Sequence, residues 1–350
     1  MNKIKEKILS HKRLNKEEAI SLFDWELISL GKLADRVRWG LHPQPVVTYI
    51  VDRNINYSNI CISGCKFCAF WRPKGHQEAY ILTKEQLGKK IEELLTLGGI
   101  QILLQGGLHP DLNIEFYEEM LSWIKRNYPS IHIHGLSPPE IAHIAQKSGL
   151  SLRETINRLK QAGLDSIPGG GAEILVDRVR KNLSPHKCDT VTWLKVMEIA
   201  HQLGLRTTAT MMFGHIETYE ERIEHMLKIR TLQDKTGGFT AFIPWTFQPK
   251  NTALSHLRPI GAVEYLKTLA ISRIVLDNIA NIQASWVTQG EKIGQISLFF
   301  GANDMGSLML EENVVAATGV HFRMKEEKMC YLIEQAGFRP QRRNMQYEWI

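Results

Sequence analysis

Two spacings of apolar residues alternate along this chain of 350 residues. One is helical: after the pair Thr83 and Gln86, spaced as in a capping box, Leu87, Ile91 and Leu94 share one face. The other is the short continuous apolar run of a buried strand, best seen in residues 46–51, Val-Val-Thr-Tyr-Ile-Val. The chain is therefore predicted to mix amphipathic helices with fully buried strands.

The alternation continues over seven or eight strand–helix units. Further strands are predicted at residues 100–104, 131–134, 207–213, 240–247 and 282–287, and helices at 14–33, 114–124, 151–163, 191–203, 218–236 and 262–278. Such alternation favours an α/β fold with a parallel sheet. Chemically suggestive residues follow the strands, which favours a TIM-like (β/α) barrel, full or nearly full, with its site at the carboxyl ends of the strands. A doubly wound open sheet is the competing architecture, but the first strand is not followed by its Gly-x-Gly-x-x-Gly sequence.

This pattern suggests three regions: an N-terminal helical extension at residues 1–44, the barrel at 45–300, and a C-terminal segment at 301–350 that packs on the barrel or completes it. The net charge of +6 is spread along the chain, which argues against nucleic-acid binding. The basic stretch from Arg339 to Arg343 is predicted to be a solvated tail. The N-terminal residues lack a signal-like apolar run, and no segment is apolar enough to cross a membrane, so a cytoplasmic protein without membrane insertion is expected.

Three of the five cysteines occur within eight residues, as Cys61-x3-Cys65-x2-Cys68. A structural zinc site would need a distant fourth ligand, such as Cys188 or a histidine. An electron-carrier cluster would need a fourth thiolate, and none is close in sequence. A [4Fe–4S] cluster held by three thiolates leaves one iron open, which points to catalysis. Cys188 and Cys330 stand alone and are predicted to be ordinary, partly buried thiols.

The cysteine spacing, with the aromatic Phe67 just before the last cysteine, resembles the radical S-adenosylmethionine (SAM) superfamily. Longer stretches are similar to the branch that contains the futalosine-pathway menaquinone enzymes and the deazaflavin FO synthase subunits: residues 54–61, 105–110, 134–138, 168–175, 212–218 and 236–240. Within this branch, the triple glycine at 169–171 and the string Ile243-Pro-Trp245 most resemble the cyclic dehypoxanthinyl futalosine synthases. Trp71 departs from the tyrosine common at that place in relatives.

The resemblance implies a radical SAM barrel with a [4Fe–4S] cluster and S-adenosyl-L-methionine as cofactors. The reaction implied is abstraction of the C4′ hydrogen of dehypoxanthine futalosine by a 5′-deoxyadenosyl radical, followed by addition of the carbon radical to the benzoate ring. Aminofutalosine synthase and FO synthase-like enzymes remain alternatives, as does a non-enzymatic metal protein. An electron donor such as flavodoxin or ferredoxin is implied, and the basic stretch near Arg342 is a candidate contact for such an acidic carrier or for the benzoate.

Several site residues are also suggested by their own positions. Gly106 and Gly107 end a strand, where they form either a tight turn or a place of close backbone approach. Strand alternation turns His132 and His134 toward the barrel interior, and His134 is nearer the carboxyl end. Glu217 and His134 are candidate bases. The resemblance assigns the cluster to Cys61, Cys65 and Cys68, the cofactor to Phe67, Gln105, Gly106, Gly107, Ser137 and Glu173, and the substrate to His134, Glu217, Trp245 and Gln248.

Overall fold

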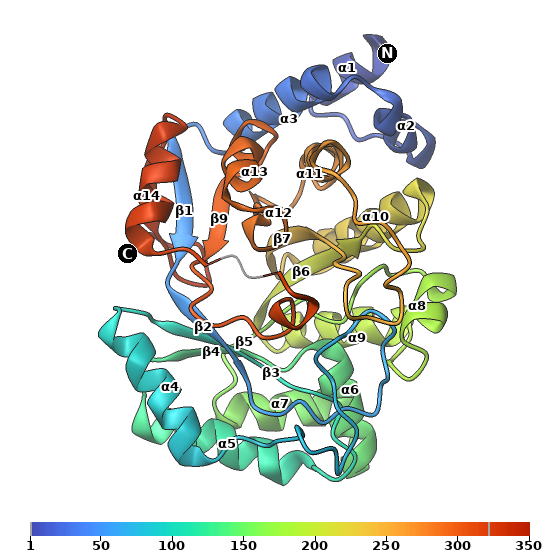
Figure 1. Cartoon of the computed structure of the whole chain (residues 1–350). Coiled ribbons are helices and arrows are strands. Elements are labelled where there is room, and N and C mark those ends of the chain that lie inside the picture. The colour runs from blue at the N-terminus through green and yellow to red at the C-terminus, as the bar shows by residue number, and fades with distance from the viewer. Residues whose placement is uncertain (1, 321–322) are drawn as a thin grey trace.

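Seven parallel strands form the central sheet of the computed structural model, which describes residues 2–320 and 323–350 (Figure 1). Their spatial order follows the sequence, and each strand pairs in parallel with the next. The strands are β2 (Asp52–Asn56), β3 (Gln101–Gln105), β4 (His132–Gly135), β5 (Ser166–Ile167), β6 (Arg206–Phe213), β7 (Phe239–Thr246) and β8 (Asn281–Ile282).

A second, three-stranded parallel sheet closes the gap between β8 and β2. It contains β1 (Val46–Ile50) between β10 (Arg339–Arg342) and β9 (Asp304–Ser307). Only Val51 separates β1 from β2, and a parallel bridge from Gln283 to Asp304 joins the end of β8 to β9. The strands therefore run around a barrel, as the alternating pattern predicted.

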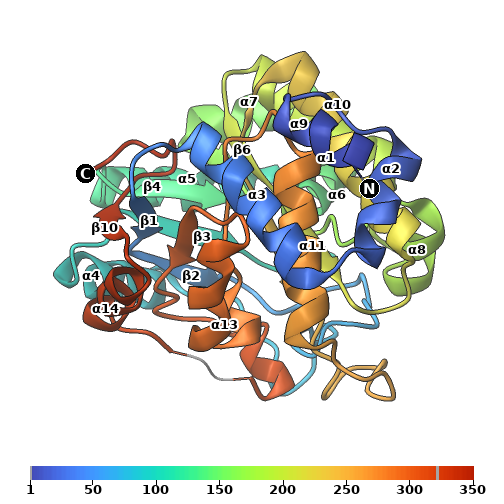
Figure 2. The same cartoon turned by 90° about the horizontal axis from the view of Figure 1, so that it is seen from above.

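Helices cover the outside of this barrel. They include α4 (Lys84–Thr96), α5 (Ile114–Asn127), α6 (Pro138–Ser148), α7 (Leu152–Ala162), α8 (Asp177–Leu183), α9 (Thr190–Gln202), α10 (Tyr219–Thr236) and α11 (Ala262–Val275). The predicted caps are confirmed: Thr83, Ser151 and Thr218 each accept the backbone N–H three residues on. Seen from above, α3 (Leu27–Leu41) lies along α11, so the N-terminal helices α1 (Asn2–Leu9), α2 (Lys16–Ser21) and α3 join the outer layer (Figure 2).

The remaining short helices belong to the C-terminal part of the chain. They are α12 (Trp286–Gln289), α13 (Glu291–Ile296) and α14 (Glu326–Gln335). Among residues 2–320 and 323–350, no helix combines the length and the apolar character needed to span a bilayer. The division of the chain at residues 44 and 300 stays a prediction.

Three local expectations were wrong, and two helices were not predicted. The helix expected over 14–33 is interrupted near Trp25, because the Glu26 carboxylate accepts the N–H groups of Ile28 and Ser29 and starts a new helix. The strand expected over 282–287 ends at Ile282, and α6 and α8 were not predicted. The basic stretch beginning at Arg339 is not a solvated tail but strand β10, paired with β1.

Candidate active site

A cavity of about 270 Å³ lies inside the barrel. Inward-facing side chains of most strands line it, and three of the residues suggested by the sequence are among them: Gln105, His134 and Trp245. Gln105 and Trp245 stand near the carboxyl ends of β3 and β7, which places them at the mouth. The His134 ring is buried, with Nδ1 2.7 Å from Ser166 Oγ. Burial lowers the pKa of His134 well below its ordinary value, so the imidazole is neutral and holds an added proton only weakly.

The inner end of the cavity is polar, which the sequence did not reveal. Asp52 and Gln101 start β2 and β3 and lie opposite each other in register. The Gln101 amide donates to Asp52 Oδ2 at 3.1 Å, and Ser307 Oγ donates to the other carboxylate oxygen. Burial raises the pKa of Asp52 to about 6, although these hydrogen bonds and the charge of Arg343 oppose the rise.

Arg343 reaches this cavity from the C-terminal segment. Its Nε and Nη2 donate to the two oxygens of the buried Asp304 carboxylate at 2.6 and 2.9 Å. The guanidinium also lies 3.9 Å from the ring centroid of Tyr347, another lining residue. Nothing in the local sequence pointed to this pair, because its partners come from β9 and from the residue after β10.

The three clustered cysteines lie in the loop that follows β2. Ser63 stands between two of them, its Oγ 3.0 Å from Cys61 Sγ and 3.2 Å from Cys65 Sγ. The backbone N–H of Leu108 donates to Cys61 Sγ at 3.2 Å, which ties the loop to the end of β3. Burial raises the pKa of the Cys65 thiol to about 11, and the nearby Lys187 ammonium opposes this rise.

The glycine pair after β3, Gly106 and Gly107, allows the cysteine loop to lie against the end of this strand. A Cβ on Gly107 would lie 2.1 Å from the carbonyl oxygen of Ile60 and 2.7 Å from Cys61 Cβ. A Cβ on Gly106 would lie 2.4 Å from the ring of Tyr57. Both positions therefore require glycine because the cysteine loop packs directly on this backbone.

Glu140 organises the neighbouring residues and was not assigned a role from the sequence. Its buried carboxylate accepts four hydrogen bonds: from Tyr57 Oη at 2.7 Å, Gly106 N at 2.9 Å, Ser137 N at 2.8 Å and Ser137 Oγ at 2.6 Å. The signal was present, since Ser137-x-x-Glu140 has the spacing of a capping box. Ser137 and Gly106 are thereby held together beside Gln105 and Gly170.

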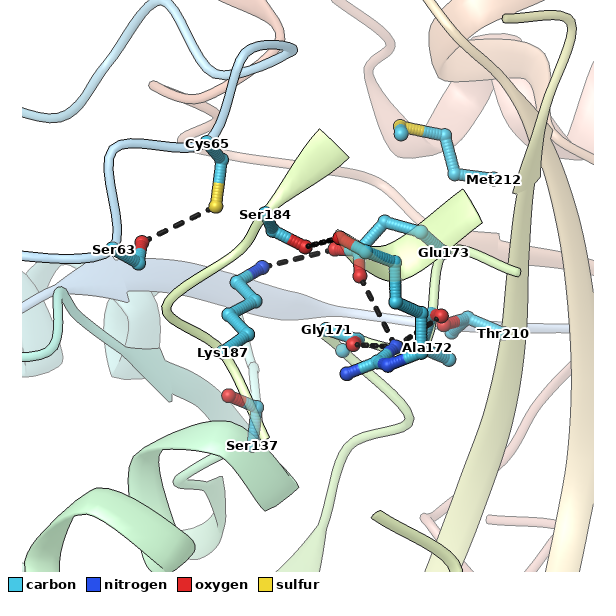
Figure 3. A network of polar contacts seen from close by, with 12 residues as sticks. Ser63, Cys65, Ser137, Gly171, Ala172, Glu173, Ser184, Lys187, Thr210 and Met212 are labelled. Carbon is cyan, nitrogen blue, oxygen red and sulfur yellow. Dashed lines mark hydrogen bonds and ion pairs between the residues drawn. The ribbon is translucent and has the colours of Figure 1, made fainter. Parts of the chain in front are cut away.

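A third group of polar residues links Glu173 to the cysteine loop (Figure 3). The Lys187 ammonium lies 3.0 Å from Glu173 Oε1 and 5.0 Å from the centroid of the Phe67 ring. Burial alone would lower the pKa of Lys187, but the nearby Cys65 and Glu173 raise it. The other carboxylate oxygen, Oε2, lies 3.6 Å from an Arg180 nitrogen and accepts no hydrogen bond from the part of the chain that the structure describes. Glu173 also has a φ of 42°, a strained value for a residue with a side chain. Phe67, Cys65 and Glu173 thus share one neighbourhood that contains an unfilled acceptor.

Comparison with known proteins decides the family. The model of the radical SAM superfamily matches residues 55–229, and that of the CofH/MqnC C-terminal region matches residues 236–350. This chain belongs to the radical SAM superfamily. It is 43% identical to the cyclic dehypoxanthine futalosine synthase of Halalkalibacterium halodurans, over 99% of this chain and 94% of that protein. The protein of the same name from Streptomyces coelicolor is 45% identical, over 97% of this chain and 86% of its own length.

A second group of relatives carries a different name. The 5-amino-6-(D-ribitylamino)uracil–L-tyrosine 4-hydroxyphenyl transferase of Methanococcoides burtonii is 41% identical, over 96% of this chain and 95% of its own. Among solved structures, methylornithine synthase has a TM-score of 0.75 at 19% identity and covers 96% of this chain and 97% of its own. This structural likeness confirms the expected barrel fold.

The radical SAM family generally uses a [4Fe–4S] cluster and SAM, and the residues near the cysteine loop fit both. Among the described residues, no three His, Cys, Asp or Glu side chains are gathered tightly enough to hold a single metal ion. A cluster does not need such convergence, because each thiolate binds a different iron atom. The unfilled oxygen of Glu173, close to Cys65, is suited to a hydroxyl group of the cofactor.

Two residues expected at the substrate are not brought to the cavity. The Glu217 side chain is fully buried beside Arg222, and it accepts the backbone N–H groups of Gly214 and His215. Burial alone would raise the pKa of Glu217, but His215 and Arg222 outweigh it and lower the pKa to about 2, so this carboxylate is a poor base. Gln248 donates to Thr246 Oγ1 at 3.0 Å and lies outside the cavity lining.

Proposed function

We propose that this protein is a radical SAM cyclase of menaquinone biosynthesis, which converts dehypoxanthine futalosine to cyclic dehypoxanthinyl futalosine. The observation that carries the proposal is the match to two curated proteins of that name, at 43% and 45% identity over nearly the whole chain. The cavity inside the barrel supports it, because a substrate that fills such a cavity displaces the water and foreign hydrogen donors that a radical reaction must avoid.

Cys61, Cys65 and Cys68 would hold the cluster in this proposal, while Phe67, Gln105, Gly106, Gly107, Ser137 and Glu173 would surround the cofactor. Together, a bound [4Fe–4S] cluster and SAM supply a 5′-deoxyadenosyl radical that removes one hydrogen atom from the substrate. Glu140 keeps Gly106 and Ser137 in place, and the glycine pair keeps the cysteine loop against the end of β3. Flavodoxin or ferredoxin would supply the electron, and the cytoplasm would be the site of action.

The cavity residues position the substrate and handle its proton. Trp245 offers an aromatic surface at the mouth, suited to the benzoate ring. His134 lines the cavity and Glu217 does not, so of these two candidates His134 is the one placed to take the proton that the ring loses, together with one electron, when aromaticity returns. Its lowered pKa means that it would pass this proton on rather than keep it. Holding the C4′ hydrogen and the ring close together is the main contribution of the protein.

The experiment is anaerobic reconstitution with iron and sulfide, followed by incubation with SAM, dithionite and dehypoxanthine futalosine. Mass spectrometry should find a product with two hydrogen atoms fewer than the substrate, together with 5′-deoxyadenosine. Cys65→Ser should abolish both products, whereas Cys188→Ser, outside the triplet, should retain them.

The transferase relatives favour a second candidate, since the Methanococcoides burtonii protein is 41% identical. Consumption of L-tyrosine and 5-amino-6-(D-ribitylamino)uracil in the same assay, with dehypoxanthine futalosine left intact, would establish that activity instead. With an enol-ether benzoate supplied in place of dehypoxanthine futalosine, an adenosyl adduct formed without free 5′-deoxyadenosine would indicate an aminofutalosine synthase.

A further inference from the structure

Three hydrogen-bond acceptors gather at the inner end of the cavity, away from the cysteine loop. They are the Asp52 carboxylate, Asn54 Oδ1 and Gln101 Oε1, and all three side chains line the cavity while being no more than 5% exposed. Within residues 2–320 and 323–350, no group donates a hydrogen bond to Asn54 Oδ1 or Gln101 Oε1. A buried acceptor without a donor is costly, so these atoms are suited to a ligand that brings donors.

The backbone fixes where these acceptors point. Asp52 and Asn54 are alternate residues of β2, so both face the barrel interior. Gln101 lies opposite Asp52 in register, and its amide nitrogen donates to Asp52 Oδ2. Reversing this amide would set its oxygen against the carboxylate, so Oε1 is the atom left without a partner.

The charges here argue against a carboxylate ligand. Arg343 is the only arginine or lysine among the described lining residues. Its Nε and Nη2 are paired with Asp304, and Nη1 donates to the carbonyl of Asn344 at 3.1 Å. A substrate carboxylate would therefore meet the acceptors of Asp52 and Gln101 without a free cation.

This inference rests on the proposed function and gives the orientation of its substrate. We infer that Asp52, Asn54 and Gln101 form a subsite for the hydroxyl groups of the substrate's ribose, with the aryl carboxylate directed toward the mouth. Hydroxyls donate hydrogen bonds to all three acceptors. The mouth, at the carboxyl ends of the strands, then holds the aromatic ring beside Trp245.

The test compares dehypoxanthine futalosine with analogues that each lack one ribose hydroxyl and with one that lacks the aryl carboxylate. Dissociation constants are measured by equilibrium dialysis with anaerobic, reconstituted protein and SAM, without reductant. The variants are Gln101→Leu and Asn54→Leu, with Gln335→Leu on the exposed face of α14 as the matched control. Iron content and melting temperature verify that each variant is folded.

We expect Gln101→Leu to weaken binding of the substrate about tenfold, the loss of about one hydrogen bond. The analogue that lacks the hydroxyl bound by Gln101 should bind the wild type and Gln101→Leu equally, while the analogue without the carboxylate should still lose about tenfold. Equal losses for every ligand, or a loss that vanishes only when the carboxylate is removed, would overturn the inference. If the wild type cyclises the substrate and the variants show either of these two patterns, the subsite is refuted and the proposed function stands. If the wild type fails to cyclise the substrate, the proposed function is refuted.

Discussion

Asp52 provides the sharpest test of the inner cavity, through the variant Asp52→Asn. Burial is the main cause of its raised pKa, Asp304 adds to the rise, and Ser307, Gln101 and Arg343 oppose it. A rise from the ordinary 3.8 to about 6 corresponds to about 3 kcal/mol. The folded protein holds this proton more tightly than the unfolded chain, so the stability that the protonated group contributes is fully present below pH 3.8 and is lost as the pH rises through 6.

Ionising Asp52 should therefore lower the free energy of unfolding of the wild type by about 3 kcal/mol at pH 7.5, and by roughly half of that at pH 5, where the carboxyl of the folded protein is still mostly protonated. Asparagine carries no such penalty, so the stability difference between Asp52→Asn and wild type should favour the variant by about 1.5 kcal/mol more at pH 7.5 than at pH 5. Urea unfolding of both proteins at both pH values measures this double difference, in which all other titrating groups cancel.

The exposed Asp111 is the control for this experiment. Its pKa is lowered by Lys74, so Asp111→Asn should show no gain with rising pH. A difference between Asp52→Asn and wild type that is independent of pH, or that shrinks toward pH 7.5, would refute the assignment of Asp52 as a desolvated carboxylate.

Three further predictions concern the cysteine loop and the buried ion pairs. Gly107→Ala places a Cβ 2.1 Å from the carbonyl just before the first cysteine, so iron content after reconstitution should fall sharply, whereas Gly261→Ala, with no atom within 4 Å, should keep it. Glu217→Gln breaks a buried ion pair and should lower the free energy of unfolding by about 3 kcal/mol while the dissociation constant for substrate stays unchanged; a large rise in that constant would restore Glu217 to the substrate site. Arg343→Met leaves Asp304 buried without its partner and should lower the unfolding free energy by roughly 3–5 kcal/mol, and full stability in urea would contradict this.

The features that the sequence predicted well depend on neighbouring residues. Thr83 and Thr218 cap helices through hydrogen bonds to the residue three positions on, and Gly163 ends a helix with a φ of 118°. Such signals lie within a single turn, so they can be recognised without knowing the fold. The orientation of His134 followed from strand alternation in the same way.

Apart from the Ser137–Glu140 capping box, the features that were missed depend on residues far apart in the chain. Val46 pairs with Arg339, and Arg343 with Asp304, so neither contact leaves a local pattern. A basic stretch usually lies in solvent, and only the closure of the barrel gives this one a buried partner. Glu217 shows the opposite case: its position after a strand suggested a place at the substrate, but Arg222, five residues on, binds its carboxylate outside the cavity lining.

The residues of the site come from two regions of the chain. The cysteines, Gln105, His134 and Glu173 lie within the part that matches the superfamily model, residues 55–229, where motifs at strand ends can be recognised. Trp245, Ser307 and Arg343 lie within residues 236–350, which match the C-terminal region model, and they complete the cavity wall. If the radical forms beside the cysteines and the cavity wall, to which both regions contribute, holds the substrate, relatives that share the cluster can differ in reaction through the cavity wall alone. The 41% identity to transferases with a different name is consistent with that division, and it makes the cavity wall, rather than the cysteine loop, the place where the two activities should be distinguished.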